Sequence, residues 1–493
     1  MGMKRISMHL VLTETSNCAC KYSTKTILIF AAAAVIFAFA PIVSARPNVV
    51  FFFLDDMRWD VTSFTGNSII TTPNMDTLAA GGTVFENAFT TVAICGPSRA
   101  SVFTGQHMAR HGVTTVQKGT YTAAQWAQSY PAQLKASGYY MGFIGKHGHG
   151  SNFTSLFGTY DFDKGYNAQG SYFGQVIDGE AAGDRHLTHF MGDLGIEFVG
   201  EAVNPAKNTT AACFCLQISF KSPHNPLLPD PAYDNLYSDD TIAHAKTDTQ
   251  AQFDDLPSFI KSAGSAPGTA EWNSNYSTEQ KFQDSAKKYY HLVHGVDVQI
   301  GRVLAALDDP DGDGDNSDSV TNNTIIILGS DHGYFLGERH QVGKWYIQEE
   351  SIRVPMVIFD PRLPAVNGDK RVSQMVLNLD IPATILDYAG VTQPAVMQGR
   401  SLRSIVEGNP PDDWRTVFLH DHPATITYAS LKNEGVRTEF FSYTRYPNNG
   451  YVKQLYDVTV DPYQRTNLAG DPRYAAKLAE LDALTTQLKT EAQ

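Results

Sequence analysis

The chain has 493 residues, of which 42% are hydrophobic, and its formal net charge at pH 7 is −13 with a pI near 5.6. This length is sufficient to bury a large core and to form two or three domains. Binding to a nucleic-acid backbone requires clustered Lys and Arg, so the negative charge excludes nucleic acids as the expected partner. An anionic ligand would need positive charge concentrated in one cleft.

The N-terminal segment has the pattern of an export signal. Basic residues precede an apolar run at 27–43, and a small-residue cleavage pattern follows at 43–45. The alternative is an uncleaved membrane anchor, but Pro41 and a length slightly short of a full span favour cleavage. We therefore predict a signal peptide over 1–45, a secreted or periplasmic protein, and no stable membrane insertion after cleavage.

The central part of the chain alternates between expected strands and helices. Continuous apolar runs at 48–54 and 324–328 are typical of parallel strands covered on both faces. Shorter candidate strands lie at 141–144, 214–220 and 355–359, and the spacing at 285–307 is helical. This alternation predicts an α/β domain over 46–410, with a doubly wound, mostly parallel sheet flanked by helices.

The pattern changes near residue 411. Short antiparallel strands are expected at 417–420, 430–438 and 439–446, and a closing helix at 474–490. We therefore predict a smaller C-terminal α+β subdomain over 411–493.

Polar clusters follow the two longest expected strands. Asp55 and Asp56 come directly after the first, and Asp331 and His332 follow the second. Ligands of open α/β sheets bind beyond the carboxyl ends of the strands, so these side chains could converge on one cation. Either pair alone could equally well cap a loop.

Cleavage of the signal peptide would leave Cys95, Cys213 and Cys215. Cys213 and Cys215 lie in an apolar stretch, and a bridge across one residue would be strained, so we expect two buried thiols. Cys95 is then a single thiol in an oxidising compartment. Pro97 suits the first turn of a helix and Gly105 its end, which places Cys95 just ahead of a helix N-terminus. Such a position favours a nucleophile or a bound anion.

The sequence Cys95-x-Pro97-Ser98-Arg99, followed by Thr104-Gly105, resembles the signature of the type I, formylglycine-dependent sulfatases of the alkaline phosphatase superfamily. Other motifs of that family recur in its order along the chain. They are Arg46-Pro47-Asn48, Asp55-Asp56, Thr72-Pro73-Asn74-Met75-Asp76, Gly145-Lys146, His224-Asn225-Pro226, Asp331-His332-Gly333, Gly343-Lys344, Arg353-Val354-Pro355, Leu455-Tyr456-Asp457 and Asp461-Pro462.

The resemblance implies a sulfuric ester hydrolase in which a formylglycine-generating enzyme oxidises Cys95 to an aldehyde. One hydroxyl of the hydrated aldehyde attacks sulfur, and deprotonation of the other re-forms the carbonyl and expels sulfate. The family pattern assigns Arg99 to hold the diol, Lys146 and Lys344 to bind sulfate oxygens, and His224 to act as the general acid. Secreted relatives make a sulfated carbohydrate the expected substrate.

The resemblance also implies a divalent metal held by Asp55, Asp56, Asp331, His332 and the modified residue 95. Carboxylate oxygens favour Ca²⁺. Many family members have Asn where this chain has His332, and a ring nitrogen leaves Mn²⁺ possible.

Three questions stay open at this point. The family histidine that follows the first lysine could be His149 or His147, and a three-residue spacing from Lys146 favours His149. A phosphonate monoester hydrolase or phosphodiesterase of the same superfamily is the main alternative activity. A non-catalytic protein that binds sulfated glycans is the alternative from another class, although such a protein has no need for Cys95 within an intact recognition sequence.

Overall fold

The computed structural model describes residues 46–114, 121–148, 158–209, 211–262, 264, 266–364, 370–423 and 431–493. Residues from Arg46 to Gln493 form one compact unit. The predicted signal peptide lies outside the described residues. Among the helices that are described, none combines the length and the apolar character needed to cross a membrane.

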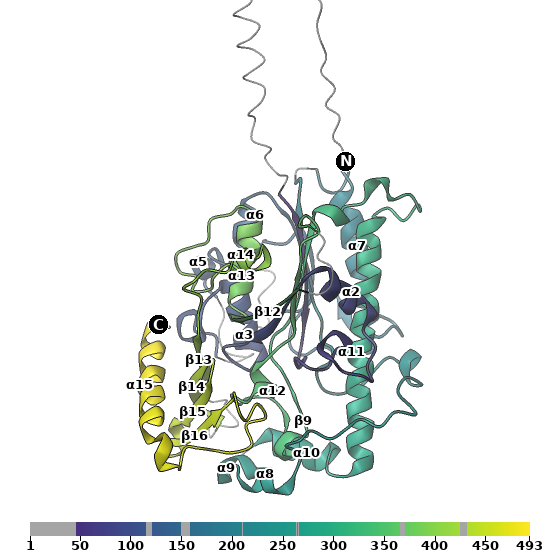
Figure 1. Cartoon of the computed structure of the whole chain (residues 1–493). Coiled ribbons are helices and arrows are strands. Elements are labelled where there is room, and N and C mark those ends of the chain that lie inside the picture. The colour runs from purple at the N-terminus through teal and green to yellow at the C-terminus, as the bar shows by residue number, and fades with distance from the viewer. Residues whose placement is uncertain are drawn as a thin grey trace, which may run out of the picture. The chain divides into compact units, whose positions relative to one another are not determined.

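An eight-stranded sheet forms the centre of the unit (Figure 1). Its order is β12 (Lys370–Leu377), β2 (Thr83–Phe89), β11 (Met356–Phe359), β8 (Thr324–Ser330), β1 (Asn48–Leu54), β7 (Phe214–Ser219), β3 (Tyr140–Lys146) and β4 (Phe162–Tyr166). Neighbouring strands are parallel except at β11, which is antiparallel to both β2 and β8. The predicted mostly parallel sheet is confirmed.

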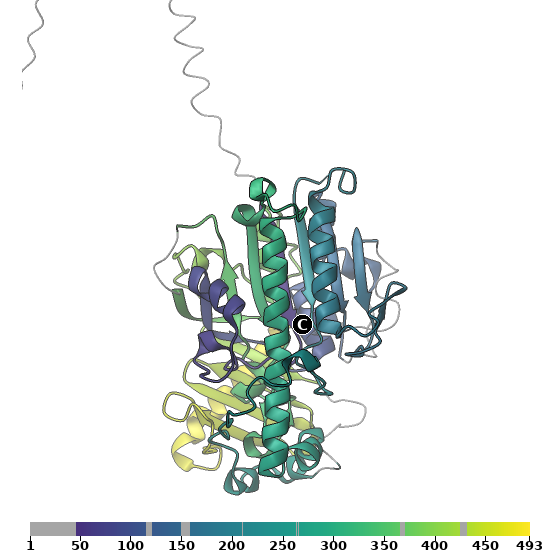
Figure 2. The same ribbon diagram turned by 90° about the vertical axis from the view of Figure 1, so that its right-hand side faces the viewer.

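Helices cover both faces of this sheet, as Figures 1 and 2 show. On one face lie α2 (Pro73–Gly81), α7 (Leu187–Val203) and α11 (Glu279–Asp308); on the other lie α3 (Cys95–Thr104), α6 (Tyr130–Ala136) and α13 (Asp380–Tyr388). Along β1, Val50 and Phe52 pack into the first core, whereas Phe51 and Phe53 pack into the second. Burial on both faces explains why β1 and β8 are continuous apolar runs.

A four-stranded antiparallel sheet forms most of the C-terminal part, in the order β13 (Val417–His422), β14 (Asn433–Thr438), β15 (Phe441–Tyr446) and β16 (Val452–Asp457). The closing helix α15 (Ala475–Glu491) packs against it through Leu481, beside Val436 and Tyr443. The predicted strands and helix are present, and β16 is an additional strand. The boundary at residue 411 stays a prediction.

The described chain also contains several short 3-10 helices. Its remaining α-helices and strands are short. They are α4 (Met108–His111), α5 (Ala123–Trp126), β5 (Val176–Ile177), β6 (Glu180–Ala181), α8 (Gln250–Asp254), α9 (Ser258–Lys261), α10 (Pro267–Asn275), β9 (Phe335–Leu336), β10 (Val342–Gly343), α12 (Glu349–Ile352) and α14 (Arg403–Val406).

Candidate active site

Four adjacent parallel strands, β8, β1, β7 and β3, bring polar residues to one edge of the sheet. Asp55 and Asp56 follow β1, Asp331 follows β8, Lys146 ends β3, and Lys221 lies two residues beyond β7. Each of these side chains is buried. The edge is the carboxyl end of the strands, where open α/β sheets bind their ligands.

Helix α3 delivers Cys95 to this edge. The helix begins at Cys95 itself, although the sequence placed Cys95 just ahead of it, and it ends before Gly105 as predicted. Gly105 has a left-handed φ of 64°. The Cys95 Sγ lies 3.3 Å from Asp55 Oδ1, 3.3 Å from His332 Nε2 and 3.6 Å from Lys344 Nζ. The side chain at this position is thus surrounded by the predicted metal ligands and by a cation.

The start of α3 is fixed by a buried polar cluster that the sequence analysis did not identify. The Ser98 hydroxyl donates to the backbone oxygen of Asp331, and Asn378 Nδ2 donates to Ser98 Oγ at 2.9 Å and to Thr90 Oγ1 at 3.0 Å. The backbone N–H of Thr91 in turn donates to Asn378 Oδ1 at 3.4 Å. These bonds tie the first turn of α3 to the ends of β8, β2 and β12.

The acidic side chains form a cluster suited to a divalent cation. Ligand atoms of Asp55, Cys95, Asp331 and His332 lie within 4.8 Å of one another, and a second such set contains Asp55, Asp56, Cys95 and His224. Burial and the neighbouring carboxylate of Asp55 raise the pKa of Asp331 to about 8. Crowding of buried carboxylates is what a divalent cation relieves, so these residues fit a metal.

The orientation of His332 also fits a metal ligand. Its Nδ1 donates to the backbone oxygen of Gly333 at 3.0 Å, because a carbonyl can only accept. The lone pair of Nε2 is therefore directed toward Cys95 and Asp331, with Asp331 Oδ1 3.6 Å away. A second hydrogen bond that fixes the tautomer is usual for a metal-binding imidazole.

Arg99 lies between the acidic cluster and β3. Its Nε donates to Asp331 Oδ2 at 3.1 Å, and its Nη1 donates to the Lys146 backbone oxygen at 3.0 Å and to Ser219 Oγ. Its Nη2 is 3.7 Å from Asp55 Oδ1. The Arg99 side chain is 1% exposed. It is thus held rigidly beside residue 95.

The two predicted sulfate-binding lysines are paired with carboxylates. Lys146 Nζ donates to Asp55 Oδ2 and, at 2.6 Å, to Gln169 Oε1; Lys344 Nζ donates to Asp56 Oδ1 at 2.5 Å. Burial would raise the pKa of Asp55, but Lys146, His224 and Arg99 together hold it well below its ordinary value. Asp55 is therefore charged and is matched by neighbouring cations.

His224 faces the same centre. Its Nδ1 donates to the Asn225 backbone oxygen at 2.6 Å, and its Nε2 is 3.7 Å from Asp56 Oδ2. Burial lowers the pKa of His224 to about 3, against the opposing effect of Asp56. With Nδ1 as the donor, Nε2 of the neutral ring is an acceptor and can donate only once the ring is protonated.

His149 lies outside the described residues, so its predicted role stays a prediction. His147 is fully buried, stacks on Phe143 with ring centroids 4.3 Å apart, and has its Nε2 4.0 Å from Asp163. Burial lowers its pKa to about 3. The ring is thus packed between β3 and β4.

Sequence reasoning missed Lys221 and Tyr172. The position of Lys221 after β7 was an available signal, because strand ends on this edge carry the other site residues. The sequence offered no comparable signal for Tyr172, which reaches His224 across 52 positions of the chain.

Comparison with known proteins identifies the group to which this chain belongs. The family model described as Sulfatase matches residues 47–391, and the model described as N-sulphoglucosamine sulphohydrolase, C-terminal, matches residues 337–491. The chain is a member of the sulfatase family.

Relatives of this sulfatase include an N-acetylglucosamine-6-O-sulfatase from Bacteroides thetaiotaomicron, which is 28% identical over 90% of this chain and 87% of the relative. A solved structure of a protein with its substrate D-glucosamine-2-N,6-O-disulfate has a TM-score of 0.75 and 25% identity, covering 91% of this chain and 98% of the other. A phosphonate monoester hydrolase from Silicibacter pomeroyi has a TM-score of 0.73 at 21% identity, covering 91% of this chain and 96% of the other. The last of these shows the fold alone.

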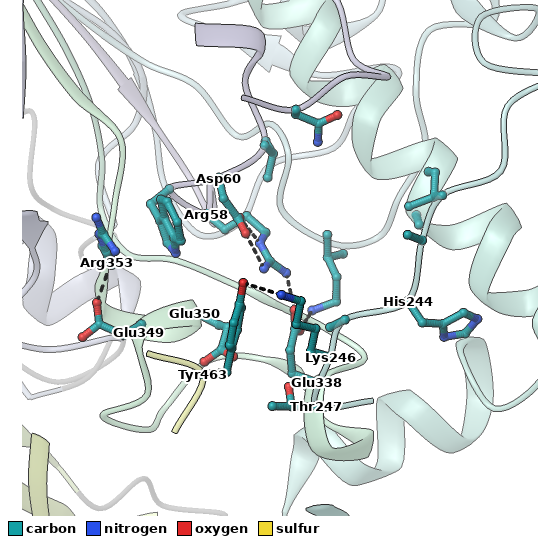
Figure 3. A pocket seen from close by; sticks show the side chains of 18 of the residues that line it. Arg58, Asp60, His244, Lys246, Thr247, Glu338, Glu349, Glu350, Arg353 and Tyr463 are labelled. Atoms are coloured by element: carbon teal, nitrogen blue, oxygen red, sulfur yellow. Dashed lines mark hydrogen bonds and ion pairs between the residues drawn. The ribbon is translucent and has the colours of Figure 1, made fainter. Parts of the chain in front are cut away.

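A cavity of about 380 Å³ in the sulfatase is lined by a different set of residues (Figure 3). Its carboxylates are paired with arginines that line the cavity or lie next to it. The pairs are Asp60 and Glu338 with Arg58, Glu349 with Arg353 and Arg437, and Glu350 with Arg339. Because Arg437 belongs to β14 and Glu349 to α12, this network joins the C-terminal sheet to the segment beside the active site.

Proposed function

We propose that this sulfatase releases inorganic sulfate from a sulfated carbohydrate, with a formylglycine derived from Cys95 as the nucleophile and a divalent cation as cofactor. The observation that carries the proposal is the position of Cys95, at the start of α3 and within 3.6 Å of Asp55, His332 and Lys344. The substrate class is supported by the glucosamine disulfate bound to one relative and by the name of another.

The formylglycine, once hydrated, supplies one hydroxyl for attack on sulfur and a second whose deprotonation releases sulfate. Arg99 is the residue to orient that group, because its guanidinium is already fixed by Asp331 and by the backbone oxygen of Lys146. The buried position excludes bulk water, so the charges around residue 95 act at short range in a medium of low polarity.

Lys146 and Lys344 are the cations that neutralise the sulfate oxygens. Each ammonium has a carboxylate partner and lies at the same end of the sheet as residue 95, so it can keep that partner and donate a further hydrogen bond to a sulfate oxygen. Their charge stabilises the transition state as negative charge moves toward the leaving group.

His224 is the general acid for the leaving oxygen. Its Nε2 must carry a proton for this task, and the low pKa of the empty site opposes that state. A bound sulfate ester brings a negative charge beside the ring, which favours the imidazolium. The ring then donates its Nε2 proton as the bond between sulfur and the ester oxygen breaks. We assign His149 as a further residue of this group.

Asp55, Asp56, Asp331, His332 and residue 95 are the residues that would hold the cation, which would lower the pKa of the attacking hydroxyl. The oxygen-rich set favours Ca²⁺, and the nitrogen of His332 leaves Mn²⁺ as the alternative. We further propose secretion or export to the periplasm after removal of residues 1–45, and maturation by a formylglycine-generating enzyme.

The second candidate is a phosphonate monoester hydrolase or phosphodiesterase. It is favoured by the nitrogen ligand at His332 and by similarity to a multifunctional alkaline phosphatase superfamily protein from Trinickia caryophylli, 26% identical over 87% of this chain and 93% of the relative. The choice of substrate in the test separates this candidate from the sulfatase activity, because a phosphonate monoester, a phosphodiester and a sulfate monoester each carry one negative charge at neutral pH.

The test is to co-express the chain with a formylglycine-generating enzyme and to analyse the peptide that contains residue 95 by mass spectrometry. We expect the decrease in mass that accompanies conversion of a thiol to an aldehyde, and sulfate release from 6-sulfated N-acetylglucosamine in preference to phosphodiesters. The Cys95→Ala variant is the matched control and should release no sulfate. A persistent thiol after competent maturation would favour a glycan-binding protein instead.

A further inference from the structure

Lys221 is a buried cation of the active site that has no role in the mechanism described above. It is 1% exposed and follows β7 at the same sheet edge as the metal-type carboxylates. Its Nζ donates to the Asn225 backbone oxygen at 3.0 Å and lies 4.8 Å from the centre of the Tyr172 ring. The ammonium is thus directed at a backbone oxygen and an aromatic face, two groups that stabilise a cation.

The carbonyl that Lys221 contacts is the same one that orients His224. Asn225 O accepts from Lys221 Nζ and also from His224 Nδ1, at 2.6 Å. A carbonyl oxygen has two lone pairs, so both donors can be satisfied at once. The position of this oxygen sets the plane of the His224 ring and so directs Nε2 into the active site.

Tyr172 holds His224 from a second direction. Its hydroxyl donates to the His224 backbone oxygen at 2.7 Å. The Tyr172 ring is itself fixed, because it is 2% exposed and stacks on His186 with centroids 4.9 Å apart. The ring therefore contacts Lys221 on its face while its hydroxyl restrains the backbone of His224.

We propose that Lys221 and Tyr172 are positioning residues that hold His224 with its Nε2 toward the leaving oxygen of the substrate. The inference rests on the proposed function, in which His224 protonates that oxygen. A misplaced acid slows the reaction most when the departing oxygen is strongly basic and needs the proton. The position of the acid matters little when the leaving group is stable as an anion. The positioning pair therefore predicts an effect that depends on the leaving group.

The experiment measures kcat/KM of matured wild type, Lys221→Met and Tyr172→Phe with phenyl sulfate and 4-nitrophenyl sulfate. General acid catalysis contributes about 100-fold or more, and a displaced acid loses part of that, so we expect a loss of about 30-fold with phenyl sulfate and about threefold with 4-nitrophenyl sulfate. Lys221→Gln, which retains an N–H donor for Asn225 O, should recover part of the loss. Lys207→Met, at a lysine that is 60% exposed, is the control for removal of a lysine and should match wild type.

A double-mutant cycle separates positioning from other roles. In a His224→Ala background, Lys221→Met should cause no further loss that depends on the leaving group, because the acid is already absent. Equal losses with both esters would mean that Lys221 acts on the sulfate charge or on folding, and would overturn the inference while the proposed function stands.

If Lys221→Met does not fold, Tyr172→Phe decides the question, since it removes a single hydroxyl. A matured wild type that releases sulfate from no ester overturns the proposed function, and the inference with it.

Discussion

Gly148 offers a way to perturb Arg99 without changing any residue assigned to the reaction. It has a φ of +78°, and a Cβ added at this position would lie 2.4 Å from Arg99 Cδ. Ordinary carbon contacts are about 3.5 to 4.0 Å, so the Arg99 side chain would have to move by about 1 Å. It cannot move freely, because Asp331, Ser219 and the Lys146 backbone oxygen hold its guanidinium.

Two costs follow for Gly148→Ala. The left-handed backbone costs about 1 to 2 kcal/mol for a residue with a Cβ. Displacement of Arg99 weakens a buried ion pair, and loss of such a pair costs about 3 to 5 kcal/mol. Because a misplacement of about 1 Å in an active site can lower the rate about 100-fold, we expect kcat/KM for an aryl sulfate to fall by that factor.

The matched control is Gly138→Ala. Gly138 has a φ of +88° and no heavy atom within 4 Å of the added Cβ, so it carries the backbone cost alone. Thermal melts and kcat/KM of both variants therefore separate strain from the contact with Arg99. A matured Gly148→Ala variant that loses no more activity than Gly138→Ala would contradict a role for the contact with Arg99.

Three other predictions concern the metal and the C-terminal part. Removal of metal by EGTA should lower the melting temperature, and added Ca²⁺ should restore it. At a free Ca²⁺ concentration of 100 times the Kd, the expected stabilisation is about 2.7 kcal/mol. An unchanged melting curve would contradict the metal site. Arg437→Met removes the partner of Glu349 at 2.7 Å and leaves Arg353 at 3.6 Å, so it should destabilise the protein by about 1 to 3 kcal/mol in chemical denaturation. Arg473→Met, at an exposed arginine, should have no effect. Burial alone would raise the pKa of Asp482. Hydrogen bonds from Tyr443, Arg445 and Lys453 outweigh this effect and lower the pKa to about 2. The resulting stability is present above the unfolded pKa near 3.9 and is lost as the pH falls toward 2, so Asp482→Asn should lower the melting temperature at pH 6 and have little effect near pH 2.

The large sheet was predictable from the sequence. Its central strands are buried on both faces, so each is a continuous apolar run without alternating polar residues. The antiparallel orientation of β11 was not predictable, because a short apolar strand has the same residue pattern whether it runs parallel or antiparallel to its neighbours. Asp55 and Asp331 were identifiable as candidate ligands because each follows a strand directly. Their convergence depends on the pairing of β1 with β8, which joins positions 276 residues apart.

The supporting residues of the site were beyond sequence reasoning for a different reason. Asn378 acts through Ser98, 280 positions away, and Tyr172 acts through a backbone oxygen rather than through a recognisable side-chain pair. Such contacts leave no local pattern in the sequence, because any side chain that places a hydrogen-bond donor at the same position could make the same bond. Lys221 was the exception, since its place after β7 matched that of the other site residues.

The burial of Cys95 has a consequence for the order of events during synthesis. The side chain is 3% exposed, and every residue of α3 is buried between the sheet and its neighbours. An enzyme that oxidises this cysteine therefore cannot reach it once α3 has packed. In the proposed maturation, modification and folding therefore compete kinetically, and a chain that folds first would keep an unmodified thiol. The fraction of modified protein would then be set by the time that the segment around Cys95 spends unfolded, so slower folding would raise the yield of modified protein.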